Sequence, residues 1–208
     1  MKFKTLETKR FILSAFKMSD VPCLVRICSN VQVNEFLMKI PTPYTEADAE
    51  AFVNLATKEW ASGSNLRWAV RYKNAGEGGD NAPRSVPHQW SPVIGSVELR
   101  KDQGLDSIGV WIDPQTHAKG VALESVSAMI KYALETNYTK DGVIGYSHHV
   151  DNVKSQKLAS RLGFKLAGRF NSEQIGVKDR NGKYYDYLSY KLPQTIGTRR
   201  NIDAQLAR

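Results

Sequence analysis

The stretch from Ser107 to Asn137 constrains the fold of this chain more than any other segment, because a strand pattern passes through a short basic turn into a long helix pattern. Apolar side chains alternate at Ile108, Val110 and Ile112, which predicts a buried or half-buried strand that ends at Pro114. Beyond the turn, one apolar stripe recurs at helical spacing: Val121, Ala122, Val126, Met129, Ile130, Ala133 and Leu134. The segment therefore predicts a strand, a turn and a helix in succession.

The turn itself, residues 117–122, has the composition of an anion-binding site. Gly120 and Ala122 are small residues at the start of a helix, where the first backbone N–H groups have no partner within the helix. A pyrophosphate can approach such amides closely, the helix dipole favours its charge, and Lys119 adds a cation. Small residues also open helices for packing reasons, so the turn alone leaves both interpretations open.

Composition fits an ordinary globular protein of 208 residues, with 41% hydrophobic and 24% charged residues. We find no apolar run long enough to cross a membrane and no signal-peptide core, so we expect a cytoplasmic protein without membrane association. The net charge of +8 indicates an acidic partner. Without a basic stripe interleaved with aromatic residues, dedicated nucleic-acid binding is not expected. Cys23 and Cys28 are predicted to be buried thiols, and no metal site is expected.

Hydrophobic periodicity over the whole chain predicts the element order β, α, α, β, β, β, α, β, α, β, β. This order predicts an α/β (α+β) fold with a mixed, partly antiparallel central sheet flanked by helices on both faces. Residues 73–92 are rich in Gly, Asn, Pro and Ser and predict a flexible surface loop. Residues 193–208 are expected to form a basic, loosely held C-terminal tail, with a terminal helix or docking arm as the alternative.

Residues 117–122 resemble the pyrophosphate-binding signature of the GNAT superfamily of acyl-CoA-dependent N-acetyltransferases, which is Arg or Gln, two residues, Gly, one residue, then Gly or Ala. Gly120 and Ala122 match this signature, and His117 stands where Arg or Gln is usual. Over roughly residues 5–192 the chain is similar to the group that contains the ribosomal-protein N-terminal acetyltransferases. The matching segments are LETKRFIL with Arg10, PTPYT before Asp48-Ala49, VIGSVEL, IGVWIDP, HAKGVALESV and DNVKSQKLASRLGFKLAGR.

The resemblance implies a single acetyltransferase domain over 1–192, with acetyl-CoA as donor co-substrate and an amine as acceptor. It assigns the cofactor diphosphate to the backbone amides of Ala118, Lys119, Gly120, Val121 and Ala122, and it places His117 among the cofactor-binding residues as the first position of the signature. It assigns the pantetheine arm to main-chain groups of Val110, Trp111 and Ile112, where an extended polyamide can pair with a strand edge. Asn152 and Ser155 match the family's residues at the opening of the following helix, and Lys157 is placed to meet a CoA phosphate.

Acetyl transfer needs a neutral amine, a polarised thioester carbonyl and a protonated leaving thiolate. Glu98, near the end of a central strand, is the candidate general base, and the alternative is a surface residue paired with Arg100 or Lys101. Ser155 is the candidate acid for the thiolate, and a helix-capping role is compatible with it. Direct attack without a dedicated base stays open as well.

Candidate acceptor-site residues are Phe36, Tyr44 and His149, with core packing as the alternative for the two rings and a structural role for the histidine. The leading hypothesis is an N-acetyltransferase that acts on a protein N-terminus, for instance of a ribosomal protein. A small-molecule amine is the nearest alternative acceptor. A non-catalytic acyl-CoA-binding module is the other alternative, because Ser107 and Ala159 replace a Glu and a Tyr found in relatives. The protein is expected to be a monomer or a homodimer, since one edge strand is exposed.

Overall fold

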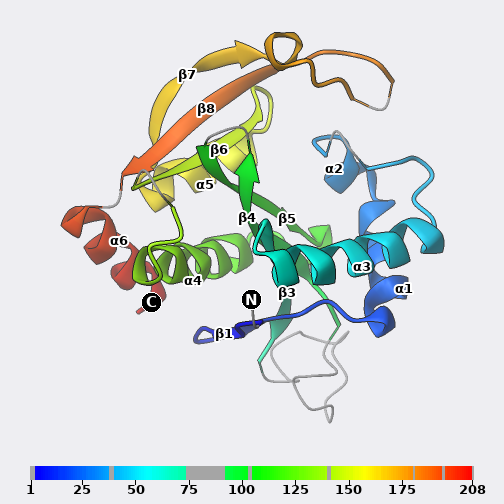
Figure 1. Ribbon diagram of the computed structural model, residues 1–208, viewed down its shortest axis with the longest axis horizontal. Helices are drawn as coiled ribbons and strands as arrows, with labels where there is room; N and C mark the ends of the chain where they lie inside the picture. Colours follow the sequence, from blue (N-terminus) through cyan, green and yellow to red (C-terminus); the bar gives the residue numbers. More distant parts are fainter. Residues whose placement is uncertain are drawn as a thin grey trace.

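The computed structural model describes residues 3–37, 40–73, 92–102, 105–139, 142–179, 181–193 and 195–207. These residues form an eight-stranded sheet in the order β1-β2-β3-β4-β5-β6-β8-β7, with helices on both faces (Figure 1). Neighbouring strands are antiparallel except β5 and β6, which are parallel. The predicted mixed sheet with helices on both faces is therefore confirmed.

The strands are β1 (Leu6–Glu7), β2 (Phe11–Ser14), β3 (Asn65–Tyr72), β4 (Gly95–Asp102), β5 (Leu105–Ile112), β6 (Val143–His149), β7 (Lys165–Asn171) and β8 (Asp186–Pro193). The helices are α1 (Val21–Cys28), α2 (Val31–Asn34), α3 (Glu46–Ser62), α4 (Val121–Glu135), α5 (Val153–Leu162) and α6 (Ile196–Leu206). Residues 74–91 of the predicted loop lie outside the described residues. The structure contains no described helix of the length and apolar character that a membrane crossing requires.

The core follows from alternation along the central strands. On β3, Trp68 and Val70 are fully buried in the cluster that contains the apolar stripe of α4, while Ala69 between them belongs to a second cluster beneath α1 and α3. The stripe predicted on the helix is buried as expected, with Met129 and Ile130 at 0% exposure. Both faces of the sheet are buried in this way. Each large apolar side chain that is removed from water stabilises the fold by about 1.5–3 kcal/mol.

The end of the chain differs from the expectation. In place of a loosely held tail, residues after Pro193 form α6, which begins at the N-cap Thr195 and packs against α4. Ile202 of this helix is 1% exposed and belongs to the main core cluster. The sequence did not clearly predict this helix, because the segment is rich in basic residues and its few apolar residues do not recur at helical spacing.

The two parallel strands diverge, and this divergence positions the site. β5 and β6 pair only at Ser107 with Gly145 and at Ile108 with Tyr146, although β5 continues to Ile112. β6 instead keeps its pairing with β8 as far as His149 opposite Tyr187. Residues 109–112 of β5 therefore present one backbone edge to the opening between the strands, within the described part of the sheet.

Candidate functional site

The turn that opens α4 has the backbone geometry of an anion site. Ala118 and Gly120 both have left-handed backbones, with φ of 62° and 77°, and Val121 is the first helical residue. The first hydrogen bond into the helix is donated by the Glu124 N–H to the Gly120 carbonyl at 3.1 Å. The His117 N–H is donated to the Pro114 carbonyl at 3.2 Å, whereas the N–H groups of residues 118–122 are left for an outside acceptor, as expected at the start of a helix. Glycine fits this position because L side chains are disfavoured at such a φ.

The predicted cofactor residues of β5 and of the turn meet at one place. Val110, Trp111 and Ile112 lie on the diverging part of β5, and the turn at 117–122 follows it through the short 3₁₀ helix Pro114–Thr116. Asp113 anchors this connection by accepting from the Gln115 N–H at 3.1 Å and by pairing with Arg26 of α1 at 2.5 Å. The strand edge and the open helix start are therefore continuous, as a cofactor with a polyamide arm and a diphosphate needs.

His117 stands in the position where Arg or Gln is usual, and its ring bridges the end of β5 and the start of α5. Its Nε2 lies 3.1 Å from the Ile112 carbonyl and its Nδ1 lies 3.0 Å from Nζ of Lys154, at the start of α5. An ammonium can only donate, so Nδ1 accepts and Nε2 carries the proton. The ring is therefore neutral in this arrangement. Burial, reinforced by the charge of Lys154, lowers the pKa of His117.

Because that pKa is lowered, we expect His117 to make stability depend on pH. Below about pH 6.5 an imidazole in the unfolded chain takes up a proton that the folded chain does not, so the free energy of unfolding falls as the pH drops. His117→Gln keeps a donor for Ile112 and an acceptor for Lys154 but does not titrate. Urea unfolding between pH 5 and 8 should give a flatter dependence for the variant. His148, whose pKa burial also lowers, supplies pH dependence in both proteins, and identical slopes would contradict the prediction.

The start of α5 carries the remaining predicted cofactor residues. Asn152 is the N-cap, and its Oδ1 accepts from the Ser155 N–H at 3.0 Å, so the capping role is present. The Ser155 side chain shares a hydrogen bond with Tyr146, the last residue of β6 that pairs with β5. Burial raises the pKa of Tyr146 to about 12, so this phenol stays protonated at neutral pH. Lys157 is exposed on the same helix.

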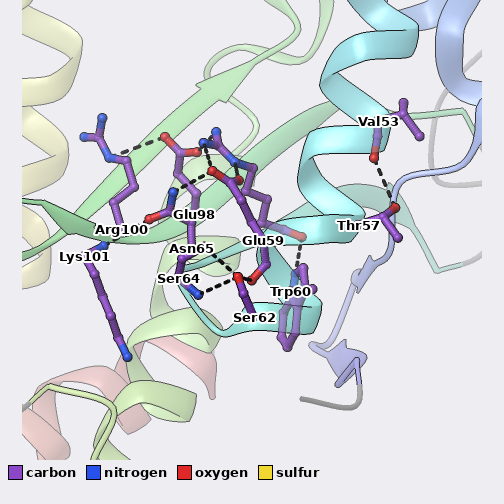
Figure 2. Close-up of polar contacts among 11 residues, drawn as sticks. Val53, Thr57, Glu59, Trp60, Ser62, Ser64, Asn65, Glu98, Arg100 and Lys101 are labelled. Carbon is purple, nitrogen blue, oxygen red and sulfur yellow. Dashed lines mark hydrogen bonds and ion pairs between the residues drawn. The ribbon is translucent and has the colours of Figure 1, made fainter.

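Glu98, the predicted general base, lies in a network of ion pairs (Figure 2). Oε2 of Glu98 pairs with Nη1 of Arg67 on β3, and Oε1 lies 3.5 Å from Nε of Arg100. Arg67 also reaches Glu59 of α3, with Nε 2.5 Å from Oε2. Arg100 Nη2 donates to the Ile108 carbonyl at 3.1 Å, where β5 and β6 begin to diverge. The network therefore reaches the opening between the strands.

The contacts of Glu98 match the alternative to a general base, which is a residue held in an ion pair with Arg100. The structure adds Arg67 as a second partner. Both carboxylate oxygens have a guanidinium partner, and the side chain is 17% exposed. The carboxylate also lies directly over Gly109, where an added Cβ would overlap with Oε1. A base needs a free lone pair toward the amine, so these contacts leave less room for that role. The assignment of Glu98 as base stays a prediction.

A second, aromatic pocket is lined by residues at and after the end of α2, by the end of β6 and by residues of the β7–β8 connection and the start of β8. Strands β8 and β7 form one edge of the sheet (Figure 1). The pocket residues are Asn34, Glu35, Phe36, Leu37, His149, Asp179, Tyr185 and Tyr187. The structure thus brings together two of the predicted acceptor residues, since the rings of Phe36 and His149 lie 5.9 Å apart. His149 also contacts Tyr185, at a centroid distance of 5.1 Å.

The third predicted acceptor residue, Tyr44, does not line this pocket. It is 8% exposed and packs in the core cluster beneath α1 and α3, which is the packing alternative. Burial raises the pKa of its phenol well above the ordinary range. Within the described residues, no three or more His, Cys, Asp or Glu side chains are grouped so that they could hold a metal ion.

Comparison with known proteins now decides the family. The model of the GNAT acetyltransferase domain matches residues 10–165, well over half of the chain. The chain belongs to the GNAT acetyltransferase family. Its co-substrate is therefore acetyl-CoA, the acetyl donor that GNAT enzymes use. A comparison with curated proteins by sequence gives no match.

Solved acetyltransferases share the fold of this GNAT enzyme at low sequence identity. RimJ of Mycobacterium smegmatis, in complex with a CoA-disulfide, has a TM-score of 0.72 and 13% identity over 98% of this chain and 95% of its own. RimL, a ribosomal L7/L12 alpha-N-protein acetyltransferase in complex with CoA, has a TM-score of 0.68 and 17% identity, with 91% and 98% covered. MccE, a microcin C7 self immunity acetyltransferase in complex with acetyl-CoA and AMP, has a TM-score of 0.70 and 17% identity, with 89% and 93% covered.

Several residues that line the aromatic pocket are absent from the sequence-based prediction. Tyr185 lies just before β8 and Tyr187 lies within it, and their i, i+2 spacing was the available signal in the sequence. Asp179 lies in the connection between β7 and β8, and its Oδ2 accepts a hydrogen bond from the Tyr185 hydroxyl at 3.1 Å. Nothing in the sequence pattern of this connection indicated a role for Asp179. Burial raises the pKa of Tyr187 to about 12, so its hydroxyl is a neutral donor at physiological pH.

Proposed function

We propose that this acetyltransferase transfers the acetyl group to a primary amine, namely the α-amine of a protein N-terminus, in a ternary complex with acetyl-CoA. The observation that carries the proposal is the place of the aromatic pocket. His149, which lines it, ends the same strand whose divergence from β5 opens the proposed pantetheine slot. An amine in the pocket would then be close to a thioester held along β5.

The lining of the pocket suits an amine. The faces of Phe36, Tyr185 and Tyr187 attract a cation through their quadrupoles, and the carboxylates of Glu35 and Asp179 add negative charge. A net charge of +8 favours an acidic polypeptide around the acceptor amine over a polycationic small molecule. The fold similarity to RimL and RimJ supports the same class of acceptor.

The proposed chemistry needs few groups. The neutral amine attacks the thioester carbonyl, the C–N bond forms, and the tetrahedral intermediate collapses with cleavage of the C–S bond. The attacking nitrogen gives one proton to solvent water, and the leaving thiolate takes up one, so protons balance over the reaction. Backbone N–H groups at the diverging edge of β5 are placed to polarise the carbonyl, and Ser155 is the candidate donor to the thiolate. His149 accepts the Asp151 N–H at Nδ1, 3.1 Å away, so its Nε2 carries a proton and serves the pocket as a donor.

A small-molecule amine is the second candidate acceptor. The fold similarity to MccE, an immunity acetyltransferase, favours it. The two candidates differ in what must be accommodated at the pocket, because a polypeptide continues beyond its α-amine and a small molecule does not.

The experiment compares acceptors with acetyl-CoA as donor. An acidic peptide with a free N-terminus should be acetylated at its α-amine, as seen by CoA release and mass spectrometry. The same peptide with a blocked N-terminus and one internal lysine should not react, and neither should spermidine. Acetylation of spermidine alone would overturn the choice of acceptor.

Glu98→Gln tests the role of Glu98 in the same assay. If Glu98 acts only in its ion pairs, the variant should keep the fall of kcat/KM toward acidic pH that the unsubstituted protein shows.

Variants at Tyr187 test the pocket itself. Tyr187→Ala should lower kcat/KM for the peptide about tenfold, because an aromatic wall and its cation contact are lost together. Tyr187→Phe keeps the ring and serves as the matched control, with a smaller loss. The KM for acetyl-CoA should stay unchanged in both, and an increase in that KM would contradict this location for the acceptor.

A further inference from the structure

Arg10, at the start of the sheet, makes an unusually complete set of contacts with the turn that opens α4. Its Nε lies 2.7 Å from Oε2 of Glu124, and its backbone N–H donates to Oε1 of the same carboxylate at 2.9 Å. Its Nη1 donates to the Lys119 carbonyl at 2.8 Å. Nη2 lies 3.1 Å from the position that a Cβ on Gly120 would occupy. A residue just before β2, more than a hundred positions away in the sequence, thus holds both the turn and the first turn of the helix.

The contact with Lys119 fixes the direction of one peptide group. The Lys119 carbonyl and the Gly120 N–H belong to the same planar, trans peptide unit, so they point in opposite directions. Because Arg10 draws the carbonyl toward the sheet, the Gly120 N–H is turned away from it, toward the outside of the turn. That is the direction in which an anion at the helix start would accept it.

The charges of Arg10 and Glu124 indicate that Arg10 positions the turn and does not attract the diphosphate by its own charge. Glu124 is 9% exposed, and it lies beneath the turn. Burial by itself would raise the pKa of Glu124, but hydrogen bonds from Thr8 and Arg10 outweigh burial and lower the pKa overall. The carboxylate is therefore ionised at neutral pH and neutralises the guanidinium, so the pair offers little net charge to a bound diphosphate.

We propose that Arg10 and Glu124 are positioning residues for the diphosphate of acetyl-CoA, acting by fixing the Lys119–Gly120 peptide and the start of α4. The proposal rests on the diphosphate site proposed at residues 117–122. In this proposal Arg10 and Glu124 hold the turn in place independently of its first residue, His117. The ring of His117 contacts Ile112 and Lys154 instead.

Glu124→Gln separates positioning from charge. The substitution keeps the size of the side chain and leaves Arg10 without its counter-ion, so simple attraction predicts tighter binding of the CoA anion. Positioning predicts the opposite, an increase of about tenfold or more in Kd for CoA by calorimetry, because a charge-assisted hydrogen bond is weakened. Arg10→Lys keeps the positive charge but cannot hold Glu124 and Lys119 together, and it should show a similar loss.

The effect should be confined to the diphosphate. With acetyl-CoA as donor, KM should rise while kcat at saturation stays within about twofold. With acetyl-pantetheine, which has the thioester but no diphosphate, kcat/KM should match that of the unsubstituted protein. Glu135→Gln removes one negative charge from the last residue of α4, where Glu135 lies exposed 3.9 Å from Lys131, and it is the matched control for the change in net charge.

The results distinguish this proposal from the one on which it rests. If Gly120→Glu prevents CoA binding while Glu124→Gln and Arg10→Lys bind as well as the unsubstituted protein, the diphosphate site stands and the positioning role is overturned. If Gly120→Glu binds CoA normally, the diphosphate site itself is misplaced. An equal loss with acetyl-pantetheine, together with a lowered thermal unfolding midpoint, would show that Arg10 and Glu124 only stabilise the fold.

Discussion

Gly120→Glu is expected to abolish the binding of acetyl-CoA while the protein stays folded. The residue opens α4 with φ of 77°, and its amide belongs to the turn proposed to hold the diphosphate. A glutamate there places a carboxylate against the phosphates, and two unit charges about 4 Å apart repel by about 4 kcal/mol at the effective dielectric of a protein surface. Calorimetry should therefore show at least a hundredfold loss of affinity for acetyl-CoA.

Two variants separate the charge from the backbone strain in this prediction. Gly120→Ala brings the strain of a left-handed backbone, on the order of 1–2 kcal/mol, without the charge, so it should weaken binding much less. Gly142→Glu carries both strain and charge at a turn where φ is 62° and no atom lies within 4 Å of the added Cβ. It should bind acetyl-CoA as the unsubstituted protein does. Normal binding by Gly120→Glu would contradict the proposed diphosphate site.

The backbone geometry of the proposed cofactor half of the site was predictable because local sequence determines it. The strand, the turn with Gly120 and the helix follow one another in the chain, and their spacing fixes which backbone groups are left without internal partners. Asn152 was equally accessible, since an N-cap is decided within three residues. Such features need no knowledge of tertiary contacts.

The acceptor half required the tertiary structure. Phe36 and His149 are more than a hundred residues apart and meet because the fold brings the end of β6 next to the segment after α2. Tyr44 has the same chemistry as Tyr187, but it is a core residue, and single-sequence patterns do not separate an aromatic in a pocket from one in the core. Likewise, the partner of Glu98 on β3, Arg67, follows from strand pairing that the sequence did not show.

Deletion of residues 195–208 should lower the thermal stability of the protein strongly, because α6 is part of the folded domain. Arg199 Nη2 donates to the Leu134 carbonyl near the end of α4, and Asn201 Nδ2 donates to the Leu162 carbonyl at the end of α5, each at 3.0 Å. The deletion leaves both carbonyls without these donors and uncovers the apolar surface under Ile202. We expect the unfolding midpoint to fall by roughly 10 °C, from a loss of a few kcal/mol.

Point variants assign this loss to particular contacts. Ile202→Ala should cost about 2–4 kcal/mol, since it removes a fully buried side chain and leaves a cavity. Asn201→Ala should cost about 1 kcal/mol through the helix end it caps. Arg200→Ala, at an exposed position of the same helix, is the control and should leave the midpoint within about 1–2 °C. If the truncated protein unfolds at the same temperature as the full chain, α6 is not docked in solution. A loosely held tail, as the charges of this segment suggest, would then describe it correctly.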